Sequence, residues 1–464
     1  MKSLPEITVI SNWKDRQHLF LRDNTIYNLH SYRQLLFGLI ALSILHFLLS
    51  GCTGPERTSS ERVTPETGTF EHYFTLPQSV APSHPIYSVE LYPSGRPNEA
   101  PFLELNSSDR LTLRFESLGF DSRSYEISFT HHNPDWSESG LSPDQFFTGF
   151  GRHDIPGGIV SRTSQPYYRS YPYHFPNQNV GFRVSGNYIL HVHNRDTGDL
   201  EFSLPFFVYE NEGTLASSAE LLRSPRYQHR VMHRPISRYL LPAMVEQPQF
   251  DLSFFYSQNQ FWGRALEARE LDFSDPNEVR FELSHNRLFH GDYEFRVLNL
   301  NNVDQLSRTV LDIDKGSKPW KITLRDDAQG FTRPITAGIP SKFGPQHSMN
   351  SNYLDVEFSF DAETYLNGDQ RIYLAGDFNS WKLSPEYQME LNEQTGRWTH
   401  SVILKEGTYR YKYVLADNNR IDDLAFDTLF PDTRQQYHAF VYFRDTQQFY
   451  HRLLQVNTFY KESR

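Results

Sequence analysis

Short runs in which apolar and polar residues alternate fill most of the chain after residue 100. Leu111–Phe115 and Tyr125–Phe129 carry apolar side chains at every second position, a period typical of strands with one buried face. Two further runs, Tyr188–Val192 and Leu200–Phe206, flank the polar turn Asn194–Asp199. This arrangement predicts a β-hairpin, so we expect antiparallel sheets in this part of the chain.

Two further blocks repeat this pattern. In the block 225–345 we expect strands at 250–256, 279–283 and 293–299, followed by the Pro/Gly-rich segment RPITAGIPSKFGP, which cannot continue a regular strand. A helix-like patch, Ala216–Leu222, precedes this block. The third block starts at Tyr353, and its predicted strands include 353–360 and the segments RIYLAGDFNSW, GRWTHSVIL and GTYRYKYVL.

These patterns predict an all-β chain of tandem antiparallel β-sandwich domains of the immunoglobulin-like type. The 15% aromatic content agrees with this fold class, because aromatic side chains favour pleated, half-buried surfaces.

The low mean hydropathy excludes a multi-pass membrane protein. The expected division is a leader at 1–51, a flexible tether at 52–69, and β-domains at 70–210, 211–350 and 351–464.

One apolar run, Leu35–Leu49, stands near the start of the chain. It has fifteen residues, fewer than the roughly 20 that span a bilayer, and it follows Arg33, so it predicts a signal peptide. The segment that ends the leader, Leu49-Ser50-Gly51-Cys52, resembles the bacterial lipobox, whose cysteine is acylated and begins the mature protein. The simpler interpretation is an incidental cysteine, but Cys52 is the only cysteine in the chain. We therefore expect lipidation at Cys52.

Two features of the export segment affect the rest of the chain. Residues 1–33 form a long n-region, which is explained either by a misassigned start, near residue 28, or by an n-region that is genuinely long. Removing residues 1–51 takes away five Lys/Arg and three Asp/Glu, which changes the net charge from −11 to −13. An acidic protein is a poor match for nucleic acid or an anionic membrane surface. With a single cysteine, no intrachain disulfide can form.

Catalytic and cofactor motifs are absent from the sequence. It contains no G-x-S-x-G elbow, no H-E-x-x-H pair, no phosphate loop and no dinucleotide fingerprint. A thiol nucleophile is excluded after residue 52. We therefore expect a protein that is not an enzyme and that holds no cofactor and no metal.

Three polar clusters have a functional and a structural interpretation. His191 and His193 share a strand face and could hold a transition metal, but a solvated face is the interpretation we prefer. The segment HHNPDW at 131–136 could be a ligand loop, but Asn-Pro-Asp equally marks a turn. Asp422, Asp423 and Asp427 could bind calcium, but without the glycine-bearing loop of an EF-hand we expect an acidic, solvated loop.

The third block resembles glycogen-binding modules of the CBM48 type. Its GDFNSW segment, 376–381, is similar to their early strand and loop, and EGTYRYKYVL, 406–415, is similar to their central hairpin. The resemblance implies that Trp381 stacks on a sugar face and that Lys412 contacts a hydroxyl group. The second tryptophan of those modules has no counterpart at 418–420, which weakens the inference of glycan binding.

A second resemblance covers nearly all of the chain after the tether. HHNPDW (131–136), FPNQN (175–179), SGNYILHV (185–192) and GDFNSW (376–381) are similar, in order and spacing, to type IX secretion system plug proteins of Bacteroidetes-like bacteria. The family's usual His-Cys-Asn is His131-His132-Asn133 here. The motif residues, which we expect to be structural, are His131, Asn133, Asp135, Trp136, Gly186, Asn187, Tyr188, Gly376, Phe378 and Asn379.

This resemblance implies a non-catalytic protein that plugs the periplasmic side of the outer-membrane translocon barrel when it is idle. The expected partners are this barrel and, through acylated Cys52, the lipid bilayer. The expected location is the outer membrane with the body in the periplasm. The alternative function is a lipid-anchored glycan-binding protein that uses the CBM48-like module. A hydrolase with a divergent site is a third class, which the missing catalytic motifs disfavour.

Overall fold

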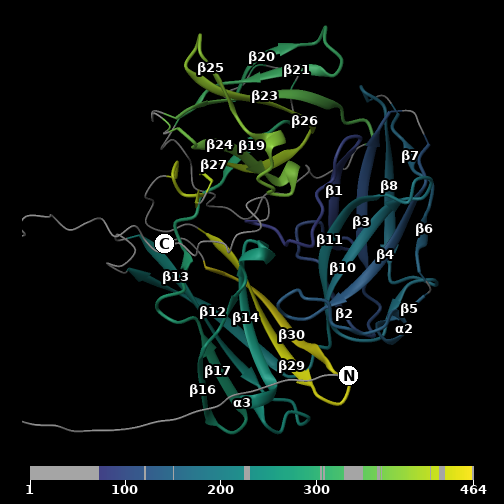
Figure 1. The fold of residues 1–464 in the computed structure, drawn as a ribbon, viewed down its shortest axis with the longest axis vertical. Coiled ribbons are helices and arrows are strands. Elements are labelled where there is room, and N and C mark those ends of the chain that lie inside the picture. The colour runs from purple at the N-terminus through teal and green to yellow at the C-terminus, as the bar shows by residue number, and fades with distance from the viewer. Residues whose placement is uncertain are drawn as a thin grey trace, which may run out of the picture. The chain divides into compact units, whose positions relative to one another are not determined.

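The computed structural model describes residues 73–461, apart from gaps at 120–121, 150, 163, 224–229, 302, 304–305, 307–308, 329–348, 363–365, 367, 419 and 428–433. Almost all regular structure in these residues is β-strand (Figure 1), which confirms the predicted fold class. The described helices are short: α2 (Pro143–Phe146), α3 (Pro248–Asp251), η3 (Trp262–Arg264), η4 (Asp377–Asn379) and η5 (Pro385–Tyr387). None of them is long and apolar enough to cross a membrane. The predicted leader, tether and lipidation site at Cys52 lie outside the described residues.

The first sandwich consists of two sheets with the strand orders β1-β3-β8-β7 and β2-β11-β10-β4-β6. Their bounds are β1 (Ile86–Pro93), β2 (Phe102–Glu104), β3 (Leu111–Leu118), β4 (Tyr125–His132), β6 (His153–Ile155), β7 (Ile159–Val160), β8 (Tyr168–Phe175), β10 (Gly186–Asn194) and β11 (Leu200–Tyr209). A small ladder joins β5 (Phe147–Thr148) to β9 (Gly181–Phe182).

The core of this sandwich comes from the alternation along its strands. The inward residues of both sheets form one buried cluster, in which the ring of Phe115 stacks on that of Tyr171 with centroids 5.0 Å apart. The predicted hairpin is present: β10 and β11 are antiparallel, with Leu190 opposite Leu204.

The middle sandwich combines strands from two distant parts of the chain. One sheet has the order β12-β13-β17-β16, with β18 paired to β13, and the other has the order β15-β14-β29-β30. The bounds are β12 (Thr214–Arg223), β13 (Val231–Leu240), β14 (Leu252–Gln258), β15 (Leu266–Glu267), β16 (Glu270–Asp275), β17 (Glu278–Glu282), β18 (Phe289–His290), β29 (Gln435–Asp445) and β30 (Tyr450–Lys461). The core includes the stacked rings of Phe254 and Phe281, 4.2 Å apart.

The third sandwich has sheets of order β19-β27-β24, with β28 on β27, and β20-β21-β23-β26-β25, with β22 on β23. The bounds are β19 (Arg296–Asn299), β20 (Val310–Asp314), β21 (Trp320–Leu324), β22 (Asp327–Ala328), β23 (Tyr353–Asp361), β24 (Arg371–Gly376), β25 (Glu390–Asn392), β26 (Arg397–Lys405), β27 (Thr408–Ala416) and β28 (Ile421–Asp422). Phe360 and Tyr413 stack in its core at 4.0 Å.

The prediction of a helix-like patch at Ala216–Leu222 is wrong. These residues belong to β12, whose side chains alternate between exposed and half-buried and which pairs along its length with β13. Alanine and leucine favour helices in isolation, but here the ladder to a neighbouring strand and one packed face decide the conformation.

The sheets join strands from both sides of residue 350. β14 pairs with β29, with Phe254 opposite Val441, and β19 pairs with β27, with Leu298 opposite Tyr409. The chain therefore passes from the middle sandwich into the third and then returns. The domain limits at 210 and 350 remain a prediction about folding units, because the sheets themselves are built from non-contiguous segments.

Candidate functional site

The motif HHNPDW lies at the end of β4 and in the turn that follows it. The backbone amide of Trp136 donates to the carbonyl of Asn133 at 2.9 Å. The amide and hydroxyl of Ser137 donate to the carboxylate of Asp135 at 3.0 and 2.6 Å. The structure thus has the turn that we preferred over a ligand loop.

The second motif, at the start of β10, packs directly against the first. Nε2 of His131 donates to the carbonyl of Ser185 at 3.0 Å in a buried contact. Gly186 has a φ of 142°, and a Cβ atom there would lie 2.3 Å from Nε2 of His131, so any side chain would displace the imidazole. Burial lowers the pKa of His131 to about 4. This histidine is therefore neutral at pH 7 and serves packing. The hydroxyl of Tyr188, from the same motif, donates to the carbonyl of Val184 at 2.8 Å.

Motif residues also join the first sandwich to the C-terminal hairpin of the middle sandwich. The hydroxyl of Tyr442 in β29 donates to Oδ1 of Asn187 at 2.7 Å, and both groups are buried. The amide of Leu453 in β30 donates to the hydroxyl of Ser185 at 3.0 Å. An apolar cluster surrounds these bonds: Leu76, Ala100, Trp136, Ile189, Phe207, Trp262, Phe440, Tyr442 and Leu453. The motif therefore acts at an interface between two sandwiches.

A buried ion pair joins the first sandwich to the third. The ammonium of Lys405 in β26 lies 2.8 Å from the carboxylate of Glu116 in β3, which also accepts from the hydroxyl of Tyr353 at 2.7 Å. The ammonium lies 4.5 Å from the centre of the Tyr168 ring. Burial lowers the pKa of Lys405, and the charge of Glu116 opposes that shift. A buried charge is tolerated here because it is paired and hydrogen-bonded.

Trp381, the predicted sugar platform, is a core residue at the meeting point of the N-terminal segment with the middle and third sandwiches. Only 6% of it is exposed. Its ring lies 5.8 Å from that of Phe74 and 5.2 Å from those of Phe261 and Phe295, and its indole N–H donates to Asp377 at 3.1 Å. Stacking on a sugar requires an open ring face, which this conformation does not offer.

The rest of the GDFNSW segment builds a tight loop. Oδ1 of Asn379 accepts from the amide of Gly376 at 2.9 Å, and its Nδ2 donates to the carbonyl of Leu374 at 3.0 Å. A Cβ on Gly376 would lie 2.7 Å from both the Arg410 carbonyl oxygen and the ring of Phe378. The glycine and the asparagine are therefore explained by close packing and by satisfied backbone groups.

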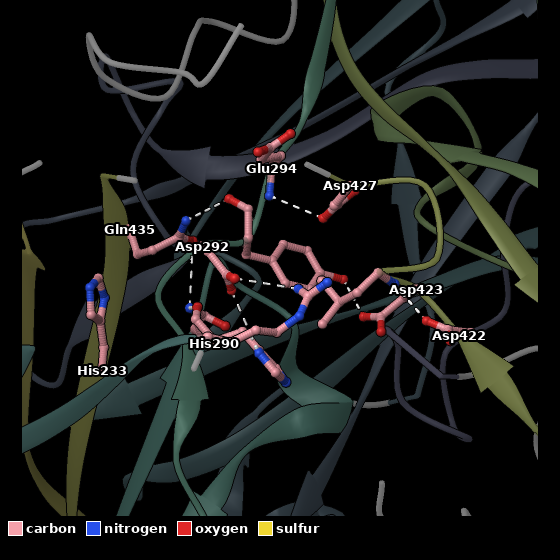
Figure 2. A network of polar contacts seen from close by, with 12 residues as sticks. His233, His290, Asp292, Glu294, Asp422, Asp423, Asp427 and Gln435 are labelled. Carbon is pink, nitrogen blue, oxygen red and sulfur yellow. Dashed lines mark hydrogen bonds and ion pairs between the residues drawn. The ribbon is translucent and has the colours of Figure 1, made fainter. Parts of the chain in front are cut away.

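Lys412, the predicted hydroxyl contact, is buried between the middle and third sandwiches. Two residues that it contacts, Glu294 and Asp427, are shown beside Asp423 in Figure 2. The ammonium of Lys412 donates to the carboxylate of Asp427 at 2.5 and 2.7 Å and to the carbonyl of Glu294 at 2.8 Å. These three contacts saturate its three N–H donors. A sugar hydroxyl would have to displace one of them.

The prediction that Asp422, Asp423 and Asp427 form a solvated loop is wrong. Asp423 is buried, and its carboxylate lies 2.8 Å from the guanidinium of Arg264 and accepts from the hydroxyl of Tyr293 at 2.5 Å. Burial would raise the pKa of Asp423, but Arg264 and Lys412 lower it to about 2. Asp423 and Asp427 pair with Arg264 and Lys412 because the fold brings η3, β27 and the 421–427 segment together. Asp422, by contrast, is half-buried and lies 3.8 Å from its neighbour Arg420.

The two strand histidines do not form a metal site. His191 and His193 share a face of β10, as expected, and accept from or donate to Thr130 and Ser128 at 2.9 and 3.3 Å. Burial, followed by the neighbouring His193, lowers the pKa of His191 to about 4. Across the described part of the chain no group of three or more His, Cys, Asp or Glu side chains could hold a metal ion.

One cavity of about 140 Å³ lies where the N-terminal segment meets all three sandwiches. Leu76, Val89, Leu204, Phe261 and Trp381 contribute to its walls. Pockets for small ligands usually measure roughly 300–1,000 Å³. The cavity is therefore better explained as imperfect packing at a junction of three units.

Sequence reasoning missed the residues that hold the sandwiches together. Glu116 and Lys405 lie on strands whose neighbours alternate normally, and nothing local distinguishes them from surface charges. The Asn187–Tyr442 bond spans 255 residues, so only the fold reveals it.

One comparison with known proteins coincides with the first sandwich. Residues 86–210, from β1 to the end of the first sandwich, match the family model described as "Type 9 secretion system plug protein 1st domain". A search among the curated proteins found no match. A crystal structure of a hypothetical protein from Parabacteroides merdae ATCC 43184 is similar, with a TM-score of 0.73 and 22% identity over 82% of this chain and 99% of that chain. At this identity the likeness shows a shared fold.

Two further solved structures overlap more loosely. The C-terminal domain of the antigen I/II-family protein AspA from Streptococcus pyogenes has a TM-score of 0.17 and 7% identity, covering 80% of this chain and 98% of that chain. Dimeric latent PorU from Porphyromonas gingivalis has a TM-score of 0.13 and 10% identity. The overlap covers 82% of this chain and 34% of that chain. Scores this low do not indicate a common arrangement.

Proposed function

We propose that this chain is a non-catalytic lipoprotein of the type IX secretion system that plugs the periplasmic side of the outer-membrane translocon when the translocon is idle. The observation that carries the proposal is the match of residues 86–210 to the first domain of plug proteins. In this proposal acylated Cys52 holds the body at the outer membrane, with the translocon barrel as its partner.

The way the sandwiches are joined supports a plugging role. A plug must resist deformation, because a barrel wide enough for folded cargo would leak around a flexible body. Here Glu116–Lys405 and Asn187–Tyr442 bridge different sandwiches in buried positions, and the buried Asp423 bridges to the half-buried Arg264. Buried, satisfied polar contacts of this kind fix one arrangement because alternatives leave charges unpaired.

The glycan-binding alternative has no specific observation in its favour. Trp381 and Lys412, the two residues that would contact sugar, are both buried and engaged with protein groups. We therefore retain the plug proposal alone.

The decisive experiment is affinity purification of the tagged full chain from the native bacterium after gentle detergent extraction. The proposal expects a large outer-membrane barrel to co-purify. A matched control fuses residues 1–72 to an unrelated β-sandwich, so that it carries the same leader and tether without the body. Equal recovery of the barrel with that control, or no recovery with the full chain, would contradict the proposal.

A second measurement tests the sealing itself. Deletion of the gene should raise sensitivity to large hydrophilic antibiotics that the outer membrane normally excludes. The full chain should restore resistance, and the control fusion should not.

A further inference from the structure

Two phenylalanines are the most exposed large apolar side chains among the described residues. Phe250 in α3 is 71% exposed, and Phe449 in the turn between β29 and β30 is 83% exposed. Isolated apolar residues on a surface need no explanation, but large ones gathered in one place usually mark a contact.

These two residues come from separate segments that lie at the same end of one sheet, where β14 begins and where β29 turns into β30. Phe250 lies just before β14, whose first residue Leu252 is opposite Phe443 of β29. Phe449 lies just beyond the last ladder pair of β29 and β30, Asp445 with Tyr450. In Figure 1, α3 and this turn lie at the same end of the sheet. We call Phe250 and Phe449 the aromatic tip.

The backbone at Phe449 adds a second, independent observation. Its φ is 60°, in the left-handed region, which is costly for a bulky side chain and is normally filled by glycine or asparagine. Its amide donates to the carbonyl of Asp445 at 2.9 Å, which closes the turn. The turn would form more readily with another residue, so a phenylalanine here, exposed on a strained backbone, points to a function outside the fold.

The residues around the aromatic tip indicate whether its partner is a protein or a lipid surface. Residues 446–448, Thr-Gln-Gln, are uncharged and exposed, and Asp445 faces Arg452 at 3.9 Å. Aromatic anchors in protein interfaces sit at the centre of a broad patch that excludes water around them. A hairpin turn is too narrow to provide such a patch around its aromatic residues. Arg444 is exposed beside the turn and Asp251 follows Phe250, so the charges next to the tip are of both signs. Protruding aromatic rings with polar neighbours match the boundary between lipid headgroups and acyl chains.

We infer that the aromatic tip inserts into the headgroup boundary of a lipid bilayer and orients the body on the membrane. This inference does not rest on the proposed function, because it requires no protein partner. The lipid should be zwitterionic, since the chain carries a net charge of −11 and an anionic surface would repel it.

The test places an environment-sensitive fluorophore at single positions of the full chain. Cys52→Ser removes the only native cysteine, and Phe449→Cys or Leu391→Cys introduces one site for labelling. Leu391 is a matched control, because it is 48% exposed on β25 of the third sandwich. Each protein is reconstituted in phosphatidylcholine vesicles that contain lipids with a headgroup-level quencher. We expect quenching at 449 at least threefold stronger than at 391.

A second arm tests whether the phenylalanines cause the contact. With the label at Gln447, the double substitution Phe250→Ser with Phe449→Gly should reduce quenching to the level at 391, whereas Leu391→Ser should not change it. Glycine suits the left-handed backbone, so folding is not at risk, and a thermal melt checks this. Similar quenching at 449 and 391 would overturn the inference. So would no effect of the double substitution, or stronger quenching in phosphatidylglycerol vesicles, which would indicate adsorption by charge.

Discussion

The ammonium of Lys405 lies 2.8 Å from the carboxylate of Glu116, across 289 residues of sequence and between two different sandwiches. Neither side chain has more than 4% of its surface exposed. Removing two charges from water costs several kcal/mol for each ion, and their attraction repays this only when the remaining hydrogen-bonding groups are also satisfied. The hydroxyl of Tyr353 supplies one such bond to Glu116. This contact therefore fixes how the two units pack.

Lys405→Met should destabilise the protein by about 3 kcal/mol, because the buried Glu116 carboxylate loses its ammonium partner and keeps only the guanidinium of Arg114, 3.2 Å away. Adding Glu116→Gln should recover most of this loss, since both charges are then gone. Urea unfolding of the single and double variants measures the effect. Arg96→Ala, which removes an exposed partner of Glu99, serves as the control and should cost less than about 1 kcal/mol. A loss below 1 kcal/mol for Lys405→Met would contradict this account.

The hydrogen bond between Asn187 and Tyr442 predicts coupling between the first sandwich and the C-terminal hairpin. Tyr442→Phe leaves the buried amide oxygen of Asn187 without this donor and should cost about 1–3 kcal/mol. In a double-mutant cycle with Asn187→Leu, the two losses should be clearly non-additive. Additive losses would mean that the bond contributes nothing to the interface.

Stability should fall as the pH drops from 6.5 to 4. The pKa of His131 is about 4 in the fold against 6.5 in the unfolded chain, so in this window the unfolded state binds the proton and the folded state does not. The free energy of unfolding then decreases by up to about 3 kcal/mol by pH 4 from this group. Urea unfolding at several pH values measures the slope. His131→Gln keeps a donor for the Ser185 carbonyl and should reduce the slope, while His191, whose pKa is also about 4, supplies part of what is left. An unchanged slope would exclude His131 as a cause.

Trp381→Ala should act on stability rather than on sugar binding. Removing a buried tryptophan typically costs about 3–5 kcal/mol, and the rings of Phe74, Phe261 and Phe295 would lose a common contact. The half-buried Trp320 in β21 is the control, and Trp320→Ala should cost less. Glycan affinity gels should not retain the wild-type chain. Specific retention that disappears in a still-folded Trp381→Ala variant would revive the glycan hypothesis.

Phe449→Gly should leave the protein as stable as before or increase its stability by up to about 1 kcal/mol. It relieves a left-handed backbone that costs a bulky residue about 1–2 kcal/mol, and the added freedom of glycine in the unfolded chain offsets part of this gain. Leu391→Gly, at an exposed strand position without positive φ, should lose about 0.5–1 kcal/mol. Denaturant unfolding compares the two, and a loss above 1 kcal/mol at Phe449 would show that its side chain supports the fold.

The alternation of apolar and polar residues was enough to predict the β-class and most strands. Successive side chains of a strand point to opposite faces of its sheet, so burial of one face produces this alternation within a few neighbouring residues. It predicted the β10–β11 hairpin and the turn at Asn133–Trp136, where the neighbours in sequence are also the partners in space. It failed at Ala216–Leu222, where intrinsic helix propensity was overruled by a ladder to β13.

The sequence by itself therefore determined the elements, the motifs and the absence of catalytic patterns. Only the tertiary structure decided which charged and aromatic residues are buried. The sequence pattern predicted Trp381, Lys412 and Asp423 as accessible residues. In the fold, Phe74 and the segments 261–264 and 293–295 pack over them. Burial depends on contacts between segments hundreds of residues apart, and no local pattern encodes which segments will meet.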